Sequence, residues 1–118
     1  YDLKSVSPTL LWSYIGTKNG LADWFADDVQ NEEKLFTFFW NKSSQQAHQI
    51  AVRSGSYIRF HWLDDEDEKS FFELRISSSE LTGATMLVIT DFAYPDEMAD
   101  SRGLWDHQIE TLRRKLGV

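Results

Sequence analysis

The sequence predicts an α+β domain: a curved antiparallel sheet of about six to seven strands wrapped around one long C-terminal helix, with two short helices after the first strand. Two observations predict this fold. Apolar side chains recur every three to four residues near the C-terminus, at 99–116, whereas much of 28–92 alternates apolar and polar residues. Strands joined by short turns pair antiparallel and share one apolar face, which the long helix must cover.

Composition narrows the functional classes. The chain has 118 residues, so we expect a single domain over residues 1–118 with a substantial core. It has no cysteine, which excludes disulfides, thiolate metal sites and thiol nucleophiles. A net charge of −7 argues against binding to nucleic acid or to anionic membrane surfaces. Since no apolar run reaches membrane length and no secretory signal is present, we expect a cytoplasmic protein with no membrane span.

The first part of the chain carries clear helix boundaries. Residues 1–6 alternate weakly and are expected to form the first strand. Ser7 and Pro8 are typical of a helix start, and Gly16 is typical of a helix end. Thr17 can cap a second short helix, whose apolar residues recur at helical spacing: Leu21, Trp24 and Phe25.

The middle of the chain indicates a series of hairpins that leads into the final helix. After a short strand around Val29, we expect strands at 35–40, 45–53, 57–63, 69–77 and 84–92. Turn-forming residues separate them at 31–33, 41–44, 54–55, 64–68 and 82–83. The apolar stripe of the final helix consists of Met98, Trp105, Ile109, Leu112 and Leu116. Gly103 interrupts this helix, either to let the backbone approach the sheet or to mark a bend.

Consecutive acidic residues form the most conspicuous charged feature: Asp64, Asp65, Glu66, Asp67 and Glu68. They do not match a calcium loop, because Lys69 and Ser70 stand where that pattern needs a ligand and a glycine. Two interpretations stay open, a solvated hairpin loop or a docking site for a basic protein partner. The three histidines lack ligand spacing, so we expect no metal and no cofactor.

The sequence offers no clear catalytic group. Ser54-Gly55-Ser56 lies between two strands, not at the strand-to-helix elbow that a nucleophilic serine needs. Asp91 is the most interesting carboxylate, because alternation from Thr85 to Ile89 turns it inward at the end of a cavity. There it either caps a strand end or pairs with a cation, or it binds a polar ligand group. We assign no catalytic residue and keep an enzyme as the least favoured alternative.

Large aromatic side chains form the strongest constellation in the sequence. Aromatic residues make up 14% of the chain and occur in predicted helices and strands alike. The set is Trp24, Phe25, Phe36, Phe38, Trp40, Phe60, Trp62, Phe72 and Trp105. Such residues either fill a core or line an apolar ligand pocket, and both interpretations stay open.

Several motifs, in their order along the chain, resemble the START-like superfamily, also called SRPBCC, which shares the helix-grip fold of the birch-pollen allergen. They are Thr17-x-x-Gly20-Leu21-x-x-Trp24-Phe25, the aromatic run at 35–40, the strand ending in Trp62, the apolar strand Thr85–Ile89, and Leu104-Trp105-x-x-x-Ile109-x-x-Leu112. Within the superfamily, the chain is similar to the heat-shock ATPase activator (Aha-type) branch and to small single-domain bacterial START-like proteins of unassigned function.

The resemblance implies a pocket between the sheet and the terminal helix that binds an apolar or amphipathic, lipid-like molecule. The alternative that it implies is a protein-interaction or chaperone-modulating module. Trp24 and Phe25 would close the entrance of the pocket, and Trp105 would stand in its helix wall. The expected ligand-binding residues are Trp24, Phe25, Phe38, Trp40, Phe60, Trp62, Phe72, Leu74, Leu87, Ile89, Asp91, Trp105, Ile109 and Leu112.

Overall fold

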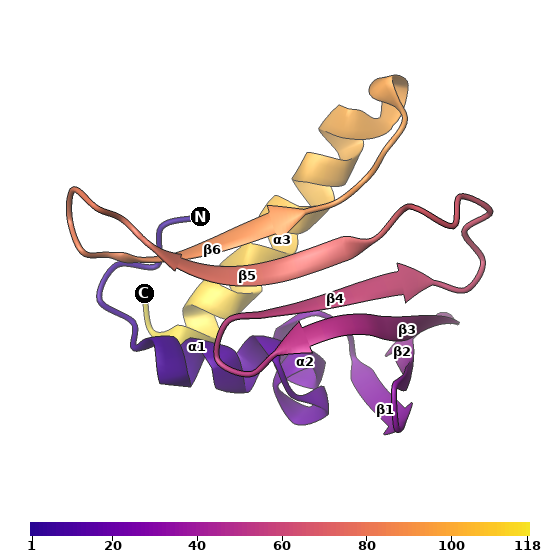
Figure 1. The fold of residues 1–118 in the computed structure, drawn as a ribbon, viewed down its shortest axis with the longest axis horizontal. Helices are drawn as coiled ribbons and strands as arrows, with labels where there is room; N and C mark the ends of the chain where they lie inside the picture. Colours follow the sequence, from indigo (N-terminus) through magenta and orange to yellow (C-terminus); the bar gives the residue numbers. More distant parts are fainter.

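The computed structural model describes residues 1–118 and confirms the α+β class (Figure 1). Six strands form one antiparallel sheet in the order β1-β2-β3-β4-β5-β6, so that each strand pairs with its neighbours in sequence. The strands are β1 (Asp28–Glu32), β2 (Leu35–Trp40), β3 (Ser43–Arg53), β4 (Tyr57–Trp62), β5 (Phe72–Ser78) and β6 (Thr85–Thr90). The helices are α1 (Pro8–Ile15), α2 (Lys18–Trp24), the 3₁₀ turn η1 (Pro95–Glu97) and α3 (Met98–Leu116).

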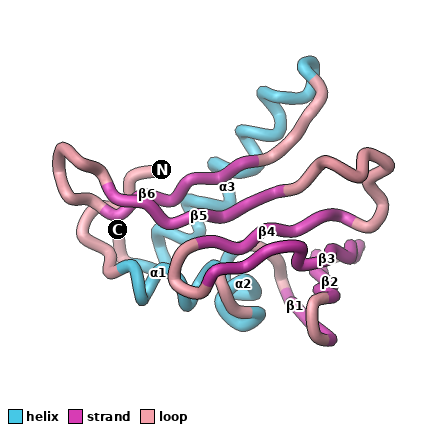
Figure 2. Tube along the Cα trace, in the orientation of Figure 1, coloured by secondary structure: helices cyan, strands magenta, loops and turns pink.

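The long helix α3 packs on α2 and runs obliquely to the strands (Figures 1 and 2). Figure 1 shows its N-terminal turns projecting beyond the edge of the sheet. None of the helices combines the length and the apolar character that crossing a bilayer requires. Because α3 leans away from the sheet at its N-terminal end, the side chains there are only partly covered.

The short helices begin and end where the sequence predicts. The Ser7 hydroxyl accepts a hydrogen bond from the Leu10 backbone N–H, and Gly16 ends α1. The Thr17 hydroxyl accepts in the same way from Gly20 and starts α2. Each cap satisfies one of the backbone donors that a helix N-terminus leaves without a partner.

The first six residues correct one expectation, because they form no regular strand. They lie beside β6, with Leu3 N–H donating to the Thr85 carbonyl at 2.8 Å, but they form only one isolated bridge, between Asp2 and Met86. Lys4 has a positive φ of 57°, which turns the chain out of the extended conformation. The two short helices therefore precede the first true strand.

Several strand boundaries also differ from the predicted ones, among them the start of β5 and the end of β6. β5 begins at Phe72 rather than at residue 69, because the Ser70 hydroxyl donates to Asp65 and holds the preceding loop together. β6 ends at Thr90, so the alternation that was expected to reach Asp91 stops before it.

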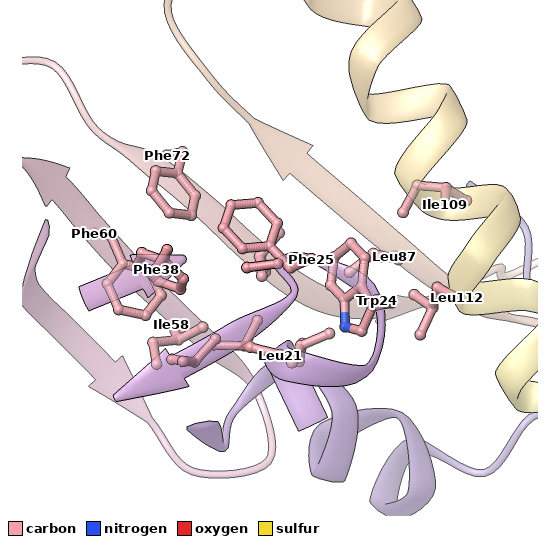
Figure 3. Packing of buried hydrophobic residues seen from close by; sticks show 14 of the residues in the cluster. Leu21, Trp24, Phe25, Phe38, Ile58, Phe60, Phe72, Leu87, Ile109 and Leu112 are labelled. Carbon is pink, nitrogen blue, oxygen red and sulfur yellow. The ribbon is translucent and has the colours of Figure 1, made fainter. Parts of the chain in front are cut away.

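The inner face of the sheet and the helices enclose one apolar core (Figure 3). The strands supply rings such as Phe38 and Phe60, both fully buried. From the predicted stripe of α3, Ile109 and Leu112 are buried, whereas Met98 is 44% exposed. Met98 is the first residue of α3, whose N-terminal turns project beyond the edge of the sheet (Figure 1). Burying a side chain of the size of Ile109 or Leu112 stabilises the fold by about 1.5–3 kcal/mol.

One charged residue, Glu73, is buried on the outer face of the sheet. Glu73 alternates with the core residues as predicted, yet it is only 5% exposed. Arg59 and Arg75 cover it, with nitrogen–oxygen distances of 2.6 and 2.7 Å, and their guanidinium groups lie over the rings of Phe71 and Tyr57. Burial alone would raise the pKa of Glu73, but the hydrogen bonds and charges of the two arginines outweigh it and hold that pKa below 4.5.

Gly103 and Gly20 form a matched pair for testing the helices. A Cβ at Gly103 would meet nothing within 4 Å, so close approach to the sheet does not require this glycine. Gly103→Ala is expected to raise the free energy of unfolding by about 0.5–1 kcal/mol, measured by urea denaturation. A Cβ at Gly20 would clash with the Ser13 carbonyl oxygen, so Gly20→Ala should lower the free energy of unfolding by about 1–3 kcal/mol. Destabilisation by Gly103→Ala would contradict this account of α3.

The Glu73 cluster predicts a dependence of stability on pH. Because the pKa of Glu73 is lower in the folded chain than in the unfolded one, its contribution is present above about pH 4.5 and is lost as the pH falls through the folded value. At pH 7, Glu73→Gln should cost about 1–2 kcal/mol of unfolding free energy, since both arginines are partly solvated. The difference between variant and parent should shrink below pH 4.5; a constant difference would contradict the assignment.

Candidate ligand-binding groove

Phe25, the residue that ends α2, fills the space between the sheet and α3. Phe25 is 4% exposed, and its ring packs against those of Phe72 and Trp105 at centroid distances of 5.6 and 5.7 Å. The three rings form a triangle, since Phe72 and Trp105 are themselves 6.1 Å apart. Phe38 meets the edge of the Phe25 ring at 5.1 Å. Figure 3 shows the Phe25 ring among the core side chains of the strands. The interior where a deep pocket was expected is therefore packed with side chains.

Half of the expected ligand-binding residues belong to this packed interior. Each of the seven is no more than 1% exposed: Phe38, Phe60, Phe72, Leu74, Leu87, Ile109 and Leu112. Their side chains contact one another and the rest of the core, as native packing density requires. In this structure they support the surface above them: none of the seven lines the groove described below, and Leu87 alone among them reaches the second hollow beside it.

An open groove of about 800 Å³ lies above the packed interior, between the end of α2, the strand ends near Trp40 and Trp62, and the first half of α3. Six of the expected residues line it: Trp24, Phe25, Trp40, Trp62, Asp91 and Trp105. Its other lining residues are Ala22, Asp23, Ala26, Asp27, Ser43, Gln45, Ser101, Leu104, His107, Gln108 and Thr111. Four tryptophans thus meet in one groove from four different elements, α2, β2, β4 and α3.

Hydrogen bonds fix three of these four indole rings. Trp24 Nε1 donates to the Tyr14 carbonyl and Trp105 Nε1 to an Asp91 carboxylate oxygen, both at 2.9 Å. Trp40 Nε1 donates to the Phe25 carbonyl oxygen at 3.2 Å. Since their N–H groups are occupied within the protein, these rings can offer a ligand only their faces and carbon edges.

Gln108 ties α3 to the same carbonyl. Its side-chain nitrogen donates to the Phe25 carbonyl oxygen at 2.9 Å, so this oxygen accepts from Gln108 and Trp40 together. The carbonyl belongs to the C-cap residue of α2, whose oxygen has no partner within that helix. The groove wall and the helix end are therefore held by one shared acceptor.

Asp91 lies just beyond the end of β6, where it is exposed and lines the groove. One carboxylate oxygen accepts from the Phe92 backbone N–H at 2.8 Å and the other from Trp105. Asp91 and Trp105 stand between the groove and a second hollow of about 590 Å³, which Ile89 and Leu87 also line. The carboxylate therefore sits on a shared rim and positions the Trp105 ring.

Sequence reasoning missed several lining residues, although a signal for them exists. Six residues of α3 line the groove, and five of them recur at helical spacing beside the buried stripe: Ser101, Leu104, Trp105, Gln108 and Thr111. The sixth is His107. Two of the five are serine and threonine and one is glutamine, so they resemble an ordinary polar helix face. In the sequence, only their position on the same side of the helix as Trp105 distinguishes them from the other polar residues of α3.

The acidic loop Asp64–Glu68 joins β4 to β5, and all five of its side chains are exposed. Hydrogen bonds from the Ser70 hydroxyl and the Asp67 backbone N–H hold the pKa of Asp65 below its usual range. Asp67 in turn accepts from the Lys69 backbone N–H at 3.0 Å. No group of three histidine, aspartate or glutamate side chains in the chain is arranged to hold a metal ion.

Solved structures resemble this chain over nearly its full length. A Bacteroides fragilis protein solved by NMR in solution is 49% identical, covering 98% of this chain and 85% of that one with a TM-score of 0.66. The Aha1 dimer from Colwellia psychrerythraea is 15% identical, covering 96% and 90% with a TM-score of 0.76. At that lower identity the likeness shows the fold alone. A comparison with curated proteins found no match.

The family itself follows from a model that spans the whole sequence. The model of the START-like superfamily domain matches residues 1–118. It agrees with the antiparallel sheet and the long C-terminal helix, and with the motifs around Trp24 and Trp105 that predicted it. The chain belongs to the START-like superfamily.

Proposed function

We propose that this domain binds an apolar or amphipathic small molecule in the groove between α2, the strand ends and α3. The observation that carries the proposal is the convergence of four tryptophans on one open groove of about 800 Å³. Small-molecule sites in proteins have volumes of about 300–1,000 Å³ and are lined mainly by apolar and aromatic side chains with few polar groups. Other START-like domains often bind small hydrophobic ligands, which supports the same assignment.

The filled interior defines how such a ligand would lie. Phe25 forms the floor, so the ligand rests along the groove and keeps part of its surface in water. Each 100 Å² of apolar surface that it covers would contribute about 2.5 kcal/mol before the costs of association. A rigid, flat body fits fixed indole faces better than a flexible chain, because less conformational freedom is lost on binding.

A protein partner at the acidic loop is the second candidate function. The five side chains of Asp64–Glu68 are exposed, and neither of the two ion pairs in the structure involves them. Internal hydrogen bonds at Asp65 and Asp67 give this loop a defined shape, so its charge is presented in one arrangement. Clustered exposed charge of this kind steers the encounter with a partner of opposite charge.

Trp105 provides the test of the groove. Trp105→Ala removes one wall while leaving the buried core in place, so it should cost about 1–2 kcal/mol of stability, against about 3–5 kcal/mol for Phe25→Ala. Fatty acids, sterols and flavonoids should be screened by thermal shift and native mass spectrometry, and at least one class should raise the melting temperature of the parent. That shift should be lost in Trp105→Ala.

The matched control for this experiment is Phe39→Ala, which removes a partly exposed ring of β2 that does not line the groove. Its melting-temperature shift with ligand should equal that of the parent. Purified parent protein that carries no extra mass and shows no shift with any compound would contradict the proposal.

The acidic loop is tested with three of its residues. Asp64→Asn, Glu66→Gln and Glu68→Gln together remove three charges while sparing Asp65 and Asp67, which hold the loop. Stability should stay within about 0.5 kcal/mol of the parent, because surface charges contribute little. Proteins retained by the immobilised parent through this loop should be lost from the variant and kept by Glu32→Gln, Glu80→Gln and Glu110→Gln. An unchanged set of retained proteins would count against this function.

A further inference from the structure

The lining of the groove is acidic as well as aromatic. Asp23, Asp27 and Asp91 line it, and no lysine or arginine does. Asp64 lies beside it, since the Gln45 side chain that lines the groove donates to an Asp64 carboxylate oxygen at 3.3 Å. Arg102 lines the second hollow and not the groove. The groove therefore has a single sign of fixed charge.

No cationic side chain neutralises these carboxylates. Both ion pairs in the structure use Glu73, on the outer face of the sheet. Asp91 accepts only from two neutral donors, the Trp105 indole and the Phe92 backbone N–H. Asp23 and Asp27 are exposed and take part in neither ion pair. Carboxylates that line a partly enclosed groove without counterions create a negative potential there.

The tryptophan rings, like the carboxylates, favour a positively charged ligand. The face of an indole ring carries negative charge density and attracts a cation, and tryptophan is the best of the aromatic side chains for this contact. Because the N–H groups of Trp24, Trp40 and Trp105 are occupied, these rings cannot donate hydrogen bonds to an anionic head. The groove thus offers a cation both ring faces and carboxylates.

From this arrangement we infer that the groove selects amphipathic molecules with a positively charged head, such as an amine or a quaternary ammonium group on an apolar body. This inference rests on the proposed function, to which it adds the charge of the ligand. The apolar body lies on the tryptophan faces while the head stays near the carboxylates of Asp23, Asp27 and Asp91. A carboxylate or sulfate head at the same place meets several like charges and no lysine or arginine.

Three probes with the same decyl chain test the charge of the head: decyltrimethylammonium, decyl glucoside and decanoate. Each is titrated below its micelle concentration and followed by tryptophan fluorescence and calorimetry. Decyltrimethylammonium should bind about tenfold more tightly than decanoate at low ionic strength, with decyl glucoside between them. The advantage of the cation should shrink in 0.5 M salt as the field is screened.

Two double variants separate the groove from the overall charge of −7. Asp27→Asn with Asp91→Asn should weaken binding of decyltrimethylammonium several-fold and leave decyl glucoside unchanged. Asparagine at residue 91 keeps an oxygen for the Trp105 indole. Glu32→Gln with Glu80→Gln changes the net charge equally at exposed residues outside the groove, and should change neither affinity by more than about twofold.

The outcomes distinguish this inference from the proposed function. Decanoate binding as tightly as decyltrimethylammonium, or an equal loss of affinity in both double variants, would overturn the selection for a cation and leave the groove as a ligand site. Failure of all three probes to bind would overturn the inference, whereas the ligand site itself is decided by the screen of fatty acids, sterols and flavonoids.

Discussion

The position of one ring, Phe25, determines how this domain is assembled. The ring joins the sheet to α3 by packing against both Phe72 and Trp105, and the backbone carbonyl of Phe25 accepts from Trp40 and Gln108. A single residue at the end of α2 thus contacts the strands through its side chain and holds two groove residues through its main chain. Aromatic contacts at 5–6 Å contribute roughly 0.5–1.5 kcal/mol each beyond their buried area, and Phe25 makes several.

The same ring decides where a ligand can lie. A sheet wrapped on a helix encloses space, and in this chain aromatic side chains occupy it down to the buried residues of α3. The proposed ligand site is consequently displaced outward to the groove, where Trp40, Trp62 and Trp105 are only partly buried. The core and the proposed ligand site use adjacent parts of one aromatic cluster, since Trp62 stacks on the core ring Phe72 at 5.0 Å while it lines the groove.

Local signals predicted most of the fold, and the errors arose where tertiary contacts overrule local pattern. The caps at Ser7 and Thr17 and the alternation of β4 depend on nearby residues, so the sequence suffices for them. The loss of a first strand depends on the positive φ of Lys4, which no periodicity reveals. The exposure of Asp91 depends on where β6 ends, and the closed interior depends on how Phe25 and Phe72 meet across the fold. Volume of this kind is a property of packing, which composition does not determine.

The alternation of side chains along each strand also determines how charge is distributed between the two faces of the sheet. Arg59 and Arg75 stand on the outer face, where Glu73 and two aromatic rings hold them. A side chain committed there cannot reach the groove, because successive residues of a strand point to opposite sides of the sheet. The carboxylates around the groove therefore keep their charge without a counterion from these strands. With Arg59 and Arg75 held on one face and the carboxylates of the groove outside both ion pairs, the groove keeps a negative potential where the tryptophans provide an apolar surface.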